Sequence, residues 1–201
     1  MVSIYQNINP KNTPVVMGHK DVKLYGEDKI IDSIGKYKFY ISPKSFFQVN
    51  PIQTEVQYNK VVEYLDLKGD EVVADLYCGI GTISLYISKY AKKVYGVEIV
   101  KDAIEDANEN LKLNNVDNVE FIHGKSEDVL PKLNNQGIKI DAIIKAEPKK
   151  IVYVSCNPAT LARDVGYLVE DGYVVEEVQP VDMFPWTMHV EAIVKLRKLL
   201  S

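Results

Sequence analysis

A cysteine follows an apolar strand in the second half of the chain, and a thiol in that place can act as a nucleophile. The predicted strand covers residues 151–154, and Cys156 lies within the segment VSCNPATLARD, residues 154–164. Open α/β sheets bind ligands beyond the carboxyl ends of their strands, and Asn157-Pro158 would stop the strand so that Cys156 faces that crevice. The alternative is a buried structural cysteine, because free cysteines are among the most buried residues.

A turn with two glycines is the second candidate for a binding site. Residues 75–82 read DLYCGIGT and lead into a predicted helix, so Gly79 and Gly81 would let the backbone approach a ligand closely. The next strand ends in Glu98, where a carboxylate in such folds accepts hydrogen bonds from ribose hydroxyls. A dinucleotide site would need a third glycine where Ser84 stands, so the pattern suits S-adenosylmethionine (SAM) better. Alternatively, the two glycines only form a tight turn, and Glu98 is a solvated residue at the end of a strand.

These residues depend on elements that alternate along the chain. Strand and helix signals at this period predict βαβ units and a mostly parallel, doubly wound α/β sheet. Residues 1–50 form a β-rich lead-in and residues 51–201 the main domain. Strands are expected over residues 15–17, 22–25, 38–41, 71–76, 93–97, 119–123, 140–144, 151–154, 173–178 and 189–198. Helices are expected over residues 52–65, 82–90, 101–113 and 127–133.

Composition narrows the class of protein. The chain has 201 residues, of which 46% are hydrophobic and 26% charged, which fits one globular domain. It contains neither a long apolar run nor a secretory signal pattern, so we expect no membrane span and a cytoplasmic location. Two cysteines, Cys78 and Cys156, and three histidines are too few for a disulfide framework or a zinc site. The net charge of -4 argues against a domain that holds nucleic acid by bulk electrostatics.

Four segments resemble, in order and spacing, the motifs of the RNA uracil-C5 methyltransferases, of the type that methylates 23S ribosomal RNA. They are SFFQVNP (45–51), DLYCGIG (75–81), VSCNPATLARD (154–164) and MHVE (188–191). The resemblance runs from about residue 3 to the end of the chain. It implies a Rossmann-like, SAM-dependent methyltransferase domain that acts on RNA, with ribosomal RNA as the first expectation and transfer RNA as the second.

The resemblance also implies roles for individual residues. Cys156 matches the cysteine that adds to C6 of uracil and makes C5 reactive toward the methyl group of SAM. Glu191 matches the base that removes the C5 proton, although a glutamate on such a strand is by itself more often an edge charge. Gln48, Tyr77 and Glu98 match residues that contact SAM. The target uridine must leave its stack to reach the cysteine.

The chain departs from the family pattern in two places. The family has Asp-Pro-Pro-Arg and a helix before the cysteine strand, whereas here only residues 145–150 separate residue 144 from residue 151. Because parallel neighbours need a crossover of about a dozen residues, we hypothesise that roughly twenty residues are missing between about Asp141 and Ala142. Residues 142–146 would then be the tail of the missing helix. The family's amino-terminal OB-like RNA-binding domain also has no counterpart, so we expect a catalytic fragment with weak RNA affinity.

Two other interpretations stay open. The first is a SAM-dependent methyltransferase for another substrate, in which Cys156 and Glu191 have no paired role. The second is a catalytically impaired fragment that binds SAM or RNA weakly. A stable covalent adduct between Cys156 and RNA that contains 5-fluorouridine would separate the leading interpretation from both.

Overall fold

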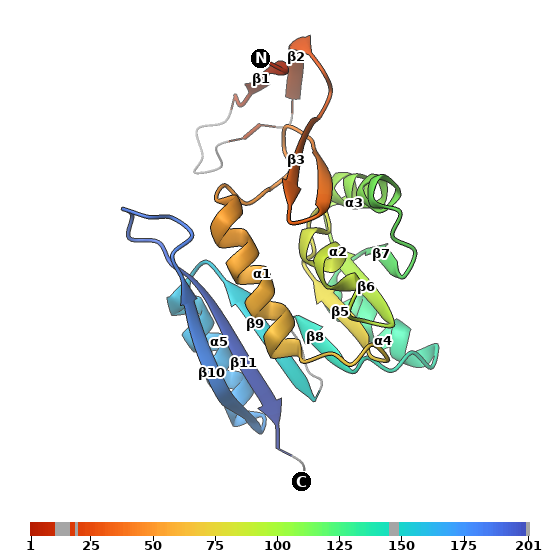
Figure 1. The fold of residues 1–201 in the computed structure, drawn as a ribbon, viewed down its shortest axis with the longest axis vertical. Coiled ribbons are helices and arrows are strands. Elements are labelled where there is room, and N and C mark those ends of the chain that lie inside the picture. The colour runs from red at the N-terminus through yellow and green to blue at the C-terminus, as the bar shows by residue number, and fades with distance from the viewer. Residues whose placement is uncertain (11–16, 19, 145–148, 200–201) are drawn as a thin grey trace.

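The computed structural model describes residues 1–10, 17–18, 20–144 and 149–199. Seven of its strands form one sheet in the order β10-β11-β9-β8-β5-β6-β7, with helices on both faces (Figure 1). These strands are β5 (Val72–Leu76), β6 (Lys93–Glu98), β7 (Val119–His123), β8 (Ala142–Ile144), β9 (Lys150–Ser155), β10 (Tyr173–Val181) and β11 (Glu191–Lys198). β11 runs antiparallel to both of its neighbours, and the pairs from β9 to β7 are parallel. The predicted Rossmann-like, mostly parallel α/β fold is therefore confirmed.

Helices cover both faces of the sheet because its strands are apolar on both sides. The helices are α1 (Pro51–Leu65), α2 (Thr82–Ser88), α3 (Lys101–Asn114), α4 (Ser126–Asn135) and α5 (Pro158–Glu170). Val73 and Val94 pack in the core that contains α1 and α2, whereas their neighbours Ala74 and Tyr95 pack with α4. Successive strand residues point to opposite faces, so a parallel sheet with two covered faces reads as a nearly continuous apolar run.

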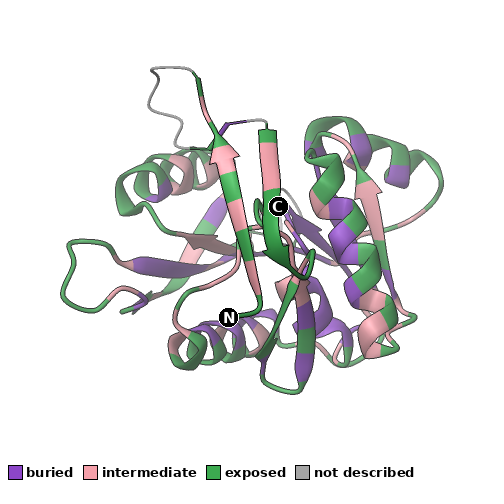
Figure 2. Ribbon diagram, turned by 90° about the horizontal axis from the view of Figure 1, so that it is seen from above, coloured by how far each residue is buried: buried purple, intermediate pink, exposed green. Residues whose placement is uncertain are grey.

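Two small antiparallel pairs precede the sheet. β1 (Ser3–Ile8) pairs with β2 (Lys20–Gly26), and β3 (Ile30–Ile34) pairs with β4 (Tyr37–Ile41). The β3–β4 pair buries Ile34, Tyr37 and Phe39 against aromatic rings of α1 and α2, while β1 and β2 carry exposed and intermediate residues (Figure 2). Expected strands 22–25 and 38–41 fall in β2 and β4, and most of the expected strand 15–17 lies outside the described residues.

Asp106 on α3 fastens this β-rich region to the main domain. Its carboxylate accepts hydrogen bonds from Lys29 Nζ at 2.7 Å, Ser42 Oγ at 2.9 Å and Ser45 Oγ at 2.6 Å. Burial raises the pKa of Asp106, but the hydrogen bonds from Lys29, Ser45 and Ser42 outweigh it, and the pKa lies below its usual value. The segment that follows Ser45, including Gln48, is thereby held against the sheet.

We expect Asp106→Asn to lower the free energy of unfolding at pH 7 by about 1–3 kcal/mol, because Lys29 keeps only its more exposed partner Glu109 and the hydroxyls that donate to Asp106 lose a charged acceptor. Asp106 has a lowered pKa in the folded state, so its contribution is present above the unfolded pKa of about 3.9. That contribution disappears as the pH falls through the folded pKa. Urea unfolding between pH 3 and 7 checks this, with the exposed Glu105→Gln on the same helix as control. A loss that stayed equal at every pH would contradict the account.

The segment before the cysteine strand differs from one of our expectations. Ala142–Ile144 is a strand, paired in parallel with β5 and β9, and so is not the tail of a helix. Asp141 fixes its register, because its N–H donates to Val72 O and its Oδ2 accepts from Val72 N. Residues 145 and 146, the rest of the proposed tail, lie outside the described residues.

Candidate functional site

A cavity of about 340 Å³ opens at the carboxyl ends of β5 and β9. Open α/β sheets bind their ligands at this edge. It brings together residues that are far apart in the sequence, from Phe46 to Glu191. Of the residues predicted for the site, it is lined by Gln48, Tyr77, Gly79, Cys156 and Glu191. Gly81 and Glu98 are not part of this lining; Gly81 belongs to the glycine turn, and Glu98 ends β6 and accepts a hydrogen bond from Gly79 N.

Cys156 is exposed between the end of β9 and the start of α5. Asn157 caps that helix, because its Oδ1 accepts from Ala159 N at 3.0 Å and Thr160 N at 3.2 Å, and Pro158 occupies the first turn. The same two residues that stop the strand therefore start a helix.

The two cysteines differ in their surroundings. Burial raises the pKa of the Cys78 thiol well above its usual value, and the carboxylates of Asp75 and Glu98 raise it further. We therefore expect iodoacetamide at pH 8 to alkylate Cys156 at least about tenfold faster than Cys78, because the thiolate is the reacting form. Peptide mapping by mass spectrometry checks this. Equal labelling in the folded protein, with a denatured sample as reference, would contradict it.

Glu191 begins β11 and reaches the cavity from the strand next to β9. Its side chain is 4% exposed, and its Oε2 accepts from Gln57 Nε2 of α1 at 3.3 Å. Tyr58, the neighbour of Gln57, lines the same cavity and shares a hydrogen bond of 2.7 Å with Thr82 Oγ1. The pKa of Tyr58 is raised by burial, so its phenol stays neutral. A carboxylate enclosed in this way can exchange a proton with a group bound beside Cys156.

The glycine turn is held in an unusual backbone conformation. Tyr77 has a φ of 61° although it is not glycine, and its exposed ring lines the cavity. Gly79 has a φ of 57°, and a Cβ built on it would meet nothing within 4 Å, so the backbone is open to a ligand here. Glu98 accepts hydrogen bonds from Gly79 N at 3.1 Å and Val100 N at 2.9 Å. Its carboxylate thereby ties the turn to the end of β6.

Packing leaves no room for a side chain at position 81. A Cβ at this position would lie 2.2 Å from Cζ of Phe121, and its φ of 81° is rare for other residues. Asp75 also lines the cavity, and its Oδ2 accepts from Ser84 Oγ at 2.6 Å. Ser84 occupies the place of the third glycine of a dinucleotide site and orients this carboxylate instead.

Sequence reasoning missed Gln57. It is fully buried on the face of α1 that also carries Thr54, Tyr58 and Val61. An amide on the buried face of a helix was the available signal, because buried polar groups need partners. The partner could be recognised only once β11 had been placed beside α1.

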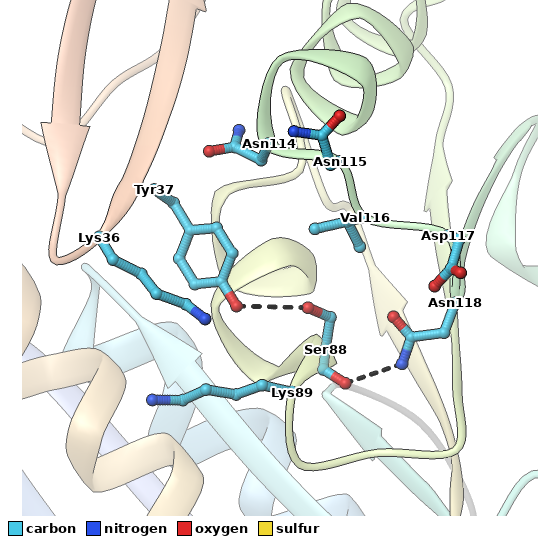
Figure 3. A pocket seen from close by; sticks show the side chains of 9 residues that line it. All are labelled: Lys36, Tyr37, Ser88, Lys89, Asn114, Asn115, Val116, Asp117 and Asn118. Atoms are coloured by element: carbon cyan, nitrogen blue, oxygen red, sulfur yellow. Dashed lines mark hydrogen bonds between the residues drawn. The ribbon is translucent and has the colours of Figure 1, made fainter.

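Other cavities lie beside the main one and at the opposite end of the sheet. One of about 130 Å³ shares Tyr77 with the main cavity and is lined further by residues that include Ile99, Ser126 and Glu127. Another, of about 280 Å³, lies where α2 and α3 end (Figure 3). There Tyr37 and Ser88 share a hydrogen bond, and Asn118 donates to Ser88 O. None of the predicted site residues lines this third cavity.

Within the described residues, no group of three or more His, Cys, Asp or Glu side chains could hold a metal ion. No helix among those residues is both long and apolar enough to cross a membrane.

Known proteins resemble this chain in sequence. A protein of Clostridium tetani named "uncharacterized RNA methyltransferase" is 58% identical over 96% of this chain and 46% of its own length. A protein of the same name in Enterococcus faecalis is 49% identical over 100% of this chain and 48% of its own length. The chain therefore spans about half the length of these curated relatives.

A solved structure shows the same likeness. The tRNA (uracil-54, C5)-methyltransferase of Pyrococcus abyssi, in complex with S-adenosyl-L-homocysteine, superposes with a TM-score of 0.78 and 33% identity. The match covers 96% of this chain and 50% of that one. The family model described as "Methyltransferase domain" matches residues 67–180, more than half of the chain. The chain therefore belongs to the methyltransferase domain family.

Proposed function

We propose that the chain is the catalytic domain of a SAM-dependent RNA methyltransferase that methylates C5 of uridine through a covalent bond between Cys156 and C6. The observation that carries this proposal is that Cys156 and Glu191, a nucleophile and a base from adjacent strands, line one cavity. Ribosomal RNA is the first substrate class and transfer RNA the alternative, which the Pyrococcus abyssi neighbour supports. The names of the curated relatives support RNA as the substrate.

The cavity fits SAM. Gln48 Oε1 is buried at the cavity with no hydrogen-bond partner among the described residues, so it offers an acceptor to a ligand. Gly79 leaves its backbone open, and Tyr77 lines both the main cavity and the smaller one. We propose that Gln48, Tyr77 and Gly79 hold SAM, with Glu98 fixing the turn and accepting hydrogen bonds from the ribose. Bound there, SAM supplies the methyl group that C5 acquires.

The protein's own residues act on the uracil ring. Cys156 reacts as the thiolate: its sulfur forms a bond to C6, and the electron pair of the C5–C6 double bond moves onto C5 and the O4 carbonyl. After C5 carries the methyl group, Glu191 takes the remaining proton from C5. The pair of electrons left by that proton restores the C5–C6 double bond and expels the sulfur as a thiolate. Cys156 and Glu191 thus return to their starting states once Glu191 releases its proton to solvent.

We also propose that a crossover is missing between β8 and β9. The alignment with the Enterococcus faecalis relative runs over 218 positions against the 201 residues of this chain, a difference of 17. On the face covered by α4 and α5, one apolar cluster reaches Ile143 and another contains Ile151, and no described helix bridges them. A crossover helix would fill this gap. Without it, the second candidate function is a SAM-binding fragment with impaired catalysis.

Restoring the crossover is expected to stabilise the protein. Inserting the corresponding residues of the relative between β8 and β9 should raise the free energy of unfolding by at least about 2 kcal/mol, because a helix would bury the apolar edge between α4 and α5. Urea unfolding measures the change. A flexible glycine–serine insert of the same length is the control and should give no gain. Equal stabilities for the two inserts would contradict the proposal.

Methyl transfer from isotope-labelled SAM tests the function directly. The chain and its crossover-restored form would be incubated with ribosomal RNA and transfer RNA transcripts, and the nucleosides separated by mass spectrometry. We expect labelled 5-methyluridine. Activity in the restored form alone would support the impaired-fragment alternative for this chain, and label on another nucleoside would contradict uracil-C5 chemistry.

A further inference from the structure

Gln57 lies where it can control Glu191 without touching the substrate. It is fully buried on α1, and its Nε2 donates to Glu191 Oε2 at 3.3 Å. Its Oε1 is also buried, and it has no hydrogen-bond partner among the described residues. Gln57 is absent from the lining of the cavity, whereas Glu191 is part of it. Any influence of Gln57 on the reaction therefore passes through Glu191.

We propose that Gln57 is a positioning residue for proton transfer by Glu191, an inference that rests on the proposed function. While Glu191 is a carboxylate, the amide N–H of Gln57 donates to it and favours the charged form, which is the form that accepts the C5 proton. Once Glu191 is protonated, the amide can turn over and offer Oε1 to the new carboxyl O–H. A primary amide carries both a donor and an acceptor, so it can serve both states.

The unpartnered Oε1 is the observation that favours this role. Burying a polar atom without a hydrogen bond is unfavourable, and an apolar residue would fill the same place on the face of α1 at lower cost. The atom gains a partner only in the protonated state of Glu191. A purely structural glutamine would need partners for both ends of its amide in the resting protein.

The other titratable groups at this cavity do not duplicate Gln57. They are Tyr58 on α1, Asp75 on β5, Tyr77 and Cys78 in the glycine turn, and Cys156 after β9. The phenol of Tyr58 already shares a hydrogen bond with Thr82, and burial raises its pKa. Asp75 accepts from Ser84 and, when charged, acts against a second negative charge at Glu191. A neutral donor at Gln57 offsets that repulsion.

The Gln57→Leu variant separates the addition of Cys156 to the uracil ring from the later removal of the C5 proton by Glu191. RNA that contains 5-fluorouridine should still trap Cys156 at the parent rate, because trapping does not require removal of a C5 proton. Turnover on unmodified RNA should fall about tenfold or more, with accumulation of the covalent adduct. The acid limb of the pH–rate profile should move to higher pH by about one unit, because the charged form of Glu191 loses a donor. Gln53→Leu on the same helix is the matched control.

Gln57→Glu is the second variant, because it keeps the size of the side chain if the leucine variant does not fold. It places a like charge beside Glu191 and should shift the acid limb further in the same direction. If both Gln57 variants kept the turnover and the pH profile of the parent, the role of Gln57 would be overturned, while the proposed function would stand. Failure of the parent, with and without the restored crossover, to be trapped by 5-fluorouridine RNA would instead contradict the proposed function.

Discussion

Replacing Cys156 by Ala is expected to lower methyl transfer to RNA by about 10⁴-fold or more, because C5 of uracil is not reactive until a nucleophile has added to C6. SAM binding, measured by calorimetry, should stay close to that of the parent, since Gln48, Tyr77 and Gly79 are unchanged. Scintillation counting of methylated RNA gives the rate. The variant therefore separates chemistry from cofactor binding.

Cys78→Ala is the matched control for this substitution. The Cys78 thiol is buried and its pKa is raised, so the variant should keep most of the methyl-transfer rate. If Cys156→Ala methylated its substrate at the parent rate, the domain would be a methyltransferase for a substrate that needs no covalent activation.

Glu191→Gln is expected to stop the reaction after the methyl group has been transferred. The C5 proton then has no acceptor, so turnover should fall by about 10²–10⁴-fold while the covalent adduct between Cys156 and methylated RNA accumulates. Denaturing gel electrophoresis followed by mass spectrometry of the adduct measures both effects. Glu170→Gln at the end of α5 is the control and should behave as the parent. Release of methylated RNA by the Glu191 variant at the parent rate would refute its role as the base.

The sequence was sufficient for the sheet but not for all of its surroundings. Apolar strands alternating with helical patterns predicted β5 to β7 and α1 to α4 to within a few residues. α5 was missed although its signals were present, because Asn157 and Pro158 were interpreted as a strand stop and not also as a helix cap and first turn. β1 and β3 were missed because their residues are largely exposed, which leaves little apolar alternation to detect.

The composition of the site could not be predicted without knowing the order of the strands in the sheet. Motifs nominated Cys156 and Glu191 separately, but their shared cavity depends on β11 lying next to β9, a pairing between segments about 40 residues apart. Gly81 was nominated for ligand approach, yet its close contact is with Phe121, which only the packed structure shows. Gln57 has the sequence context of an ordinary helix residue, and its hydrogen bond to Glu191, 134 positions away, becomes visible only in the packed structure.

Covalent capture by RNA that contains 5-fluorouridine is the most direct test of the central claim, that Cys156 attacks uracil in this cavity. Fluorine at C5 cannot be removed as a proton by Glu191, so the adduct should persist. We predict a SAM-dependent, denaturation-resistant complex whose digest places the methylated, fluorinated nucleotide on the peptide that contains Cys156. No complex in the chain or in its crossover-restored form, or a complex that persists in Cys156→Ala, would contradict the account.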